Sequence, residues 1–175
     1  DVIRSAGATS NFLGYHGFTG VICASVNEEI VHGIPGQRIL ADGDIISVDC
    51  GAIVKGWHGD AAVTIPVGAV SRKNLDLIDT TNEALWRGIA AARVGGSIGD
   101  ISNAIERFVK GQGAYGITQG FTGHGIGTEL HQAPEVPNFG RRGKGPKLAD
   151  GLVIAIEPMI TLGSSKAVIL EDEWT

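Results

Sequence analysis

The stretch "GDIISVDCGAIVKGWHGDAAVTIPVG", residues 43–68, holds two runs of apolar and β-branched residues on either side of Lys55–Gly56. A two-residue connection that ends in glycine is typical of a tight turn between antiparallel strands, so this stretch predicts a β-hairpin. With Lys55 and Gly56 as the turn, Val54 faces Trp57, and every other pair follows by counting outward. The rest of the fold can be worked out from this hairpin.

Two aspartates stand inside the apolar hairpin. In the predicted register Asp49 lies opposite Ala62, and Gly51 lies opposite Asp60. Because side chains alternate along a strand, Asp49 and Asp60 then share one face as diagonal neighbours, roughly 7–8 Å apart. Two buried carboxylates repel each other, so they share a proton, pair with a base or bind a cation. Lys55, at the tip, is the only Lys or Arg in the hairpin, which weakens the salt-bridge interpretation and leaves the other two open.

Two more residues of metal-binding type lie outside the hairpin. Glu157 follows the apolar run "LVIAI" and precedes Pro158, which holds its backbone extended, and His124 stands in the glycine-rich "GHGIG", whose glycines leave its ring little covered. With the two aspartates they form an oxygen-rich set with one imidazole, which suits Mn, Fe, Co or Zn. Bridging carboxylates allow two metals about 3.5–4 Å apart, as in hydrolases. The alternative interpretation is that the aspartates are ordinary turn or edge residues of the hairpin and that His124 is an ordinary loop residue.

Hydrophobic periodicity predicts strands, then two helices, then strands. We expect two short strands joined by a polar turn in 21–36, a helix in 71–93 with Ser71 as its N-cap, and a second helix from Ile98. Residues 152–163 are expected to form a buried strand that runs into the glutamate. This order predicts an α+β fold with an antiparallel sheet. A strand followed by a carboxylate occurs in both parts of the chain, which indicates two related halves.

Composition narrows the functional classes. The 175 residues suit one domain, 1–175, and the net charge of -5 gives no overall field that would attract nucleic acid or an anionic membrane. No apolar run is long enough to span a bilayer. Cys23 and Cys50 have no metal-type spacing, which favours a reducing compartment, the cytoplasm. Because the chain opens without an initiator Met and stops at "EDEWT", we expect a fragment that lacks flanking sequence at both ends.

Four segments, in the same chain order, resemble those of the bacterial-type, type I methionine aminopeptidases of peptidase family M24. They are "GYHGFTGVICASVNEEIVHGIP", "GDIISVDCGAIVKGWHGDAAVT", "FTGHGIGTELHQAPEVPN" and "IAIEPMI". The resemblance covers nearly the whole chain. It implies the pita-bread fold, an antiparallel sheet of two pseudo-symmetric halves with helices on its outer face. It also implies an enzyme that removes the initiator methionine from nascent polypeptides when the second residue is small.

The resemblance implies a role for each metal-binding residue. Asp49 would chelate one ion, Asp60 would bridge two, and His124 and Glu157 would complete the second site. The family's fifth ligand, a second bridging glutamate, would belong past Thr175. The expected cofactor is therefore a pair of divalent ions, cobalt, manganese, iron or zinc, and the expected nucleophile is a hydroxide that bridges them.

The resemblance also implies which residues contact the substrate. His32 would touch it near the scissile bond, and His131 would hydrogen-bond the scissile carbonyl and stabilise its developing charge. The methionine side chain would lie in a pocket lined by Phe12, Tyr15, Cys23 and Trp174.

Other interpretations stay open. A proline-directed peptidase of the same fold is one, and a pita-bread domain that binds peptides without catalysis is another, should the fifth ligand be absent. His58 shares the face of Asp60 and is expected to support the metal ligands or to lie at the surface, while His16 has no assigned role. The basic segment "RRGKGPK", 141–147, is expected to be a solvated loop, with a ribosome contact as the weaker option. We expect a monomer that binds neither DNA nor membranes.

Overall fold

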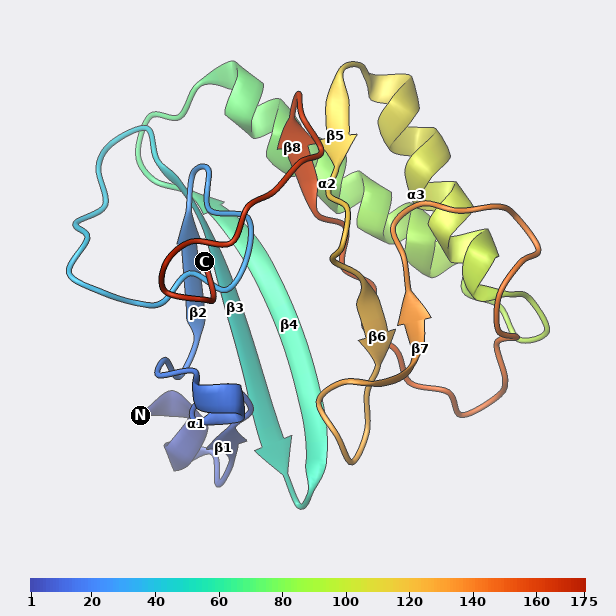
Figure 1. Ribbon diagram of the computed structural model, residues 1–175, viewed down its shortest axis with the longest axis horizontal. Helices are drawn as coiled ribbons and strands as arrows, with labels where there is room; N and C mark the ends of the chain where they lie inside the picture. Colours follow the sequence, from blue (N-terminus) through green and yellow to red (C-terminus); the bar gives the residue numbers. More distant parts are fainter. The chain divides into compact units, whose positions relative to one another are not determined.

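The computed structural model describes all residues, Asp1–Thr175, and confirms the α+β fold with antiparallel sheets (Figure 1). In chain order its elements are α1 (Val2–Ser5), β1 (Thr9–Ser10), a 3₁₀ helix η1 (Tyr15–Gly17), β2 (Cys23–Val26), β3 (Ile45–Val54), β4 (Trp57–Pro66), α2 (Arg72–Ala91), α3 (Ile98–Gln112), β5 (Tyr115–Ile117), β6 (Gly123–Gly125), β7 (Gln132–Val136) and β8 (Ile160–Leu162). None of the helices has both the length and the apolar content needed to cross a membrane.

The chain divides into two compact units. The first consists of Asp1–Leu75, Gly127–Leu130 and Val168–Thr175, and the second of Asp76–Ile126 and His131–Ala167. Each unit has its own antiparallel pairing of strands, and they are described in turn. The single catalytic domain expected from the sequence stays a prediction.

The long hairpin of the first unit has the predicted register. Val54 pairs with Trp57 across the turn, and β3 and β4 then pair along their full lengths. Lys55 and Gly56 have φ values of 52° and 82°, so both turn residues are left-handed, as a two-residue turn of this hand requires. Asp49 therefore lies opposite Ala62, and Asp60 lies opposite Gly51.

The other edge of β3 pairs with two short strands. β2 covers its first half, with Cys23 opposite Asp49, and β1 covers its last residues. The second strand expected in 21–36 is wrong, because no strand follows β2 before β3. His32 has a φ of 60°, and a Cβ on Gly33 would lie 2.6 Å from the carbonyl oxygen of Ala24. The backbone thus turns sharply against β2, with one hydrogen bond from the Ala24 amide to Gly33, instead of extending as a ladder.

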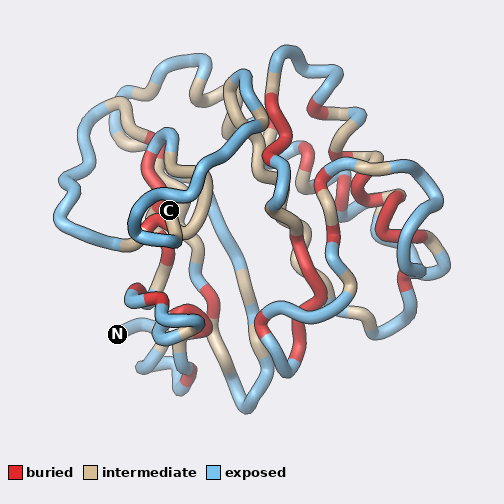
Figure 2. The backbone as a smooth tube through the Cα atoms, viewed as in Figure 1, coloured by how far each residue is buried: buried red, intermediate tan, exposed pale blue.

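The two long helices, α2 and α3, lie in the second unit, apart from the first turn of α2. The Asn74 amide donates to Ser71 Oγ at 3.3 Å, which confirms Ser71 as the cap of α2. α3 begins with a capping box, in which the Ser97 amide donates to Asp100 Oδ2 at 2.8 Å. The inward face of α3 is buried, as Figure 2 shows, and it supplies half of the core residues. That core consists of Ala84, Ile98, Ile101, Ile105, Val109, Ile117, Val136 and Leu148.

The buried strand expected over 152–163 is only partly present. β8 pairs with β5, but residues 152–159 form no regular strand. Ala155 still exchanges backbone hydrogen bonds with His124, at 3.2 and 2.7 Å, so the segment lies beside β6. Two features limit the ladder: Pro158 has no amide to donate, and the register of β6 shifts between His124 and Gly125.

Candidate metal centre and substrate pocket

The hairpin of the first unit places Asp49 and Asp60 on one face. Both side chains are partly buried, and the thiol of Cys23, opposite Asp49, is buried. Burial and, to a smaller extent, the negative charges of Asp49 and Asp60 together raise the pKa of Cys23 to about 12. The negative charges of both carboxylates therefore act on the thiol, so negative charge is concentrated on this face of the hairpin. A cation would be attracted to it.

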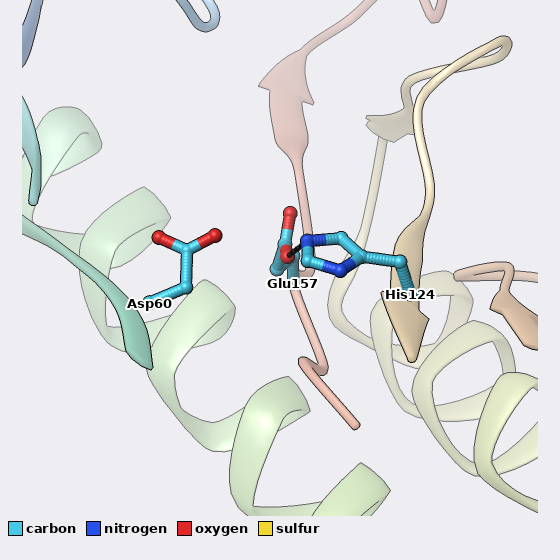
Figure 3. Close-up of side chains that lie close together, drawn as sticks. All are labelled: Asp60, His124 and Glu157. Atoms are coloured by element: carbon cyan, nitrogen blue, oxygen red, sulfur yellow. Dashed lines mark ion pairs between the residues drawn. The ribbon is translucent and has the colours of Figure 1, made fainter. Parts of the chain in front are cut away.

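In the second unit, His124 and Glu157 point toward each other (Figure 3). His124 Nε2 lies 3.0 Å from Glu157 Oε1, and its Nδ1 lies 2.9 Å from the carbonyl oxygen of Gly125. A carbonyl only accepts hydrogen bonds, so Nδ1 carries the proton, and in the neutral ring Nε2 presents a lone pair to the carboxylate. Two electron-pair donors at this distance require a proton or a cation between them. A histidine that donates its other N–H to a backbone carbonyl is typical of metal ligands.

Glycines and one asparagine hold this pair in place. A Cβ on Gly123 would lie 2.3 Å from the Ala155 carbonyl oxygen, and one on Gly125 would lie 2.2 Å from that of Ala133. The buried Asn138 donates to the backbone carbonyl of Glu157 at 2.7 Å. The glycines therefore allow neighbouring backbone to approach β6 closely. The expectation that they leave the His124 ring uncovered is wrong, since this residue is only 7% exposed.

His131 lies beside the pair. Its ring centroid is 4.3 Å from that of His124, and the two rings meet edge to face at 69°. His131 is exposed, so it can approach a ligand from solvent. The second unit thus brings together three of the predicted site residues: His124, His131 and Glu157.

An aromatic cluster forms in the first unit from residues far apart in sequence. The ring of Phe18 lies 6.5 Å from that of Phe12 and 5.0 Å from that of Trp174, and His32 lies 6.2 Å from Trp174. Three of the residues predicted to contact substrate are therefore gathered here. Phe18 joins them, although the sequence prediction omitted it. The regular spacing of aromatic residues at 12, 15 and 18 was the signal that could have identified it.

Tyr15 and Cys23, the other residues predicted to line the pocket, also lie in the first unit. Tyr15 is partly buried, and its ring meets His16 edge to face at 4.4 Å, while Cys23 is buried on β2.

Asn11 is a second residue that the sequence prediction missed. Its side-chain amide donates to the Gly59 carbonyl at 2.9 Å, beside Asp60, and it fills the space above Gly51, where a Cβ would lie 2.5 Å from Asn11 Nδ2. His58 is anchored through its backbone amide, which donates to Gly127 at 2.8 Å. Its buried Nδ1 makes no hydrogen bond. Both residues thus position the end of the hairpin that carries Asp60.

Comparisons with known proteins identify the family of this chain. Residues 2–175 match the model of Metallopeptidase family M24. Methionine aminopeptidase 1 of Mycobacterium tuberculosis (strain CDC 1551 / Oshkosh) is 51% identical over 99% of this chain and 68% of its own length. Methionine aminopeptidase 1 of Bacillus subtilis (strain 168) is 47% identical over 99% of this chain and 69% of its own.

Solved structures agree as well. The crystal structure of methionine aminopeptidase from Thermotoga maritima superposes with a TM-score of 0.96 at 38% identity and covers 99% of this chain and 70% of that one. The similarity therefore extends over sequence and fold together, along nearly the whole chain. The chain belongs to metallopeptidase family M24 and, within that family, to the methionine aminopeptidases.

Proposed function

We propose that this chain removes the N-terminal methionine from polypeptides by metal-dependent hydrolysis, with a preference for a small second residue. The observation that carries the proposal is the 47–51% identity, over 99% of the chain, to relatives named methionine aminopeptidase 1. The alternative, a proline-directed peptidase, has less support, because the relatives at this level of identity are named methionine aminopeptidases. His124 Nε2 and the Glu157 carboxylate, two donors of electron pairs, face each other at 3.0 Å. This pair supports a metal-dependent reaction independently of the relatives.

The proposed ligands are Asp49, Asp60, His124 and Glu157. The negative charge on the hairpin supports Asp49 and Asp60 as ligands, since both carboxylates raise the pKa of the buried Cys23 thiol. His124 Nδ1 donates to the Gly125 carbonyl, which leaves the lone pair on Nε2. That lone pair supports His124 and Glu157 as ligands. Divalent ions, of which we propose two (cobalt, manganese, iron or zinc), acidify bound water and polarise a carbonyl oxygen. The carboxylates and the imidazole fix where that chemistry occurs.

Two histidines are proposed to handle the scissile peptide. His131, beside His124, donates an N–H to the scissile carbonyl oxygen as its negative charge develops, a contribution of about 2.7–4 kcal/mol at comparable sites. His32 contacts the peptide near the scissile bond, with its ring held against Trp174. Each ring is positioned by a neighbouring ring, which limits its freedom before substrate binds.

The methionine side chain is proposed to enter a pocket formed by Phe12, Tyr15, Cys23 and Trp174, with Phe18 between two of them. A thioether makes favourable contacts with aromatic rings, which suits the cluster of Phe12, Phe18 and Trp174. The raised pKa of Cys23 keeps its thiol neutral at physiological pH, so it presents an apolar surface. Apolar pockets discriminate by roughly 1–3 kcal/mol per methylene, so other small apolar residues are rejected only moderately.

Release of methionine from the tripeptide Met-Ala-Ser tests this proposal. We expect release that EDTA abolishes and that added Mn²⁺ or Co²⁺ restores, and none with Asp60→Ala. A dipeptide with proline in its second position serves as the comparison substrate. Absence of EDTA-sensitive release from Met-Ala-Ser would overturn the proposal, and preferential cleavage of the proline dipeptide would favour the alternative.

The cellular setting is part of the same proposal. Cys23 and Cys50 are both free thiols, which supports a reducing compartment, the cytoplasm. We propose that the chain acts there as a monomer on nascent polypeptides, close to the ribosome.

A further inference from the structure

A groove of about 810 Å³ lies within the second unit, between the C-terminal half of α2, α3 and the loop that follows β7. None of its lining residues is a proposed metal ligand or pocket residue. Small residues such as Ala90, Ala104 and Gly111 leave room along it. Its charged lining residues are four arginines and one aspartate: Arg87, Arg93, Arg107, Arg142 and Asp100. Because the whole chain carries a net charge of -5, this positive charge is local and opposes the average.

The four guanidinium groups differ in how they are engaged. Arg87 pairs with Glu83 at 2.8 Å and lies 4.3 Å above the ring of Phe108, which fixes it at the wall of the groove. Arg93 makes one 3.3 Å hydrogen bond, to the carbonyl of Ala90, and Arg107 is exposed without an ion pair. Two guanidinium groups on the groove therefore have unused donors.

The single acid on the groove is already engaged. Asp100 accepts hydrogen bonds from the Ser97 amide and hydroxyl, both at 2.8 Å, and from the Gly143 amide at 3.1 Å. Bonds from the side chain and then the amide of Ser97 hold the pKa of Asp100 below its usual value. Arg142 lies 3.7 Å away. Asp100 is therefore ionised, and its one negative charge against four arginines leaves the groove with a positive excess.

The wall that carries Arg142 is held firmly against α3. The Gly99 amide donates to Lys144, and the Ile98 amide to Pro146, each at 2.9 Å. Asn103 donates to the Gly140 carbonyl at 3.1 Å. These bonds order the groove before any ligand arrives, which lowers the entropic cost of binding.

We propose that this groove binds a phosphate-bearing small molecule of about nucleotide size. Guanidinium groups match phosphate oxygens with paired hydrogen bonds, and four of them on one groove suit the closely spaced charges of a polyphosphate. The volume lies within the range of roughly 300–1,000 Å³ typical of small-molecule sites. The amide of Gln112 and the ring of Phe108 offer hydrogen bonding and an apolar contact for the remainder of the ligand. Glu83 and Glu106 on the same helices disfavour an extended nucleic-acid strand.

Calorimetric titration of pyrophosphate and of ATP into the chain tests this proposal. Each is titrated into the protein as purified and again after removal of divalent ions, because phosphates also bind metals. We expect binding in both states, weakened roughly tenfold or more by the double substitution Arg93→Ala/Arg107→Ala. Arg107→Lys keeps the charge but loses the planar fork, so we expect an intermediate loss. Lys73→Ala, which removes one charge from α2 outside the groove, should change affinity by less than about twofold.

Arg93, Arg107 and Lys73 are exposed and lie outside the proposed catalytic site, so methionine release by each variant verifies its folding. Failure of both ligands to bind would overturn the proposal. So would binding that vanishes with the divalent ions, or that Lys73→Ala weakens as much as the double substitution does. A short single-stranded RNA that binds through the same arginines far more tightly than ATP would replace the small molecule with a nucleic acid.

Discussion

His124 shows how one side chain can be prepared for a cation before the cation binds. The Gly125 carbonyl fixes the proton on Nδ1, which leaves Nε2 directed at Glu157. The sequence predicts both residues as ligands, from their chemistry and from motif resemblance. It could not reveal the bond to Gly125, because that contact depends on the orientation of the His124 ring relative to the next carbonyl. Asn11 and Phe18 were missed for a similar reason, since their roles depend on contacts with distant residues.

Glu157→Gln tests the charge of this pair at nearly constant volume. We expect affinity for Mn²⁺ to fall at least about tenfold, since the amide oxygen is a weaker ligand than a carboxylate. Titration calorimetry of the metal-free chain measures the change. Glu28→Gln, at an exposed carboxylate outside the proposed site, is the matched control, and an equal loss in both variants would contradict the assignment.

Cys23 and Cys50 should differ sharply in reactivity. With its pKa at about 12, Cys23 has about a thousandfold less thiolate at pH 8 than a thiol with an ordinary pKa of 9.0, and it is buried as well. We expect iodoacetamide to label exposed Cys50 in the native chain and both cysteines in urea, as read by mass spectrometry. Labelling of native Cys23 at the rate of Cys50 would show that the carboxylates and burial do not act on it.

The same shift predicts a pH dependence of stability. Between about pH 9 and 12 the unfolded chain loses the Cys23 proton while the folded chain keeps it. Stability from this group is therefore fully present below pH 9 and declines as the pH rises toward 12. Cys23→Ser should flatten that part of the curve of unfolding free energy against pH, whereas an unchanged slope would contradict the shift.

The elements differ in how far local sequence determines them. The β3–β4 hairpin could be predicted to the residue, because its turn fixes the register and the register fixes which face carries the aspartates. Both helices followed from their caps and periodicity. The segment after β2 and the residues before β8 could not, since Gly33 and Gly123 allow backbone contacts with distant segments that no local pattern encodes.

Gly125→Ala tests that close packing. An added Cβ would lie 2.2 Å from the Ala133 carbonyl oxygen, so backbone must move, and we expect a loss of roughly 1–3 kcal/mol in unfolding free energy. Gly111→Ala in α3 is the control, because its Cβ meets nothing within 4 Å and should stabilise the helix by about 0.5–1 kcal/mol. Urea denaturation measures both, and equal effects would contradict the packing argument.

At the scale of the whole molecule, the four proposed metal ligands are distributed over both units. The hairpin with Asp49 and Asp60 belongs to the first, while His124 and Glu157 belong to the second. The order of the four motifs along the chain could predict this ligand set. Composition and periodicity could not, because they report on each element separately.

Metal binding should therefore stabilise the whole chain. A metal at about a hundred times its dissociation constant contributes about 2.7 kcal/mol to the folded state, so we expect Mn²⁺ to raise the melting temperature in calorimetry. Asp60→Ala in the first unit and Glu157→Gln in the second should each reduce that increase. An increase that survives both substitutions would mean that the ion binds elsewhere.

The most direct test of the central claim is a crystal structure of the chain grown with Mn²⁺, with anomalous scattering used to locate the ions. The account predicts anomalous peaks at which oxygen atoms of Asp49, Asp60 and Glu157 and Nε2 of His124 all act as ligands, at distances of about 2.0–2.3 Å. Ions found away from these four side chains would contradict it.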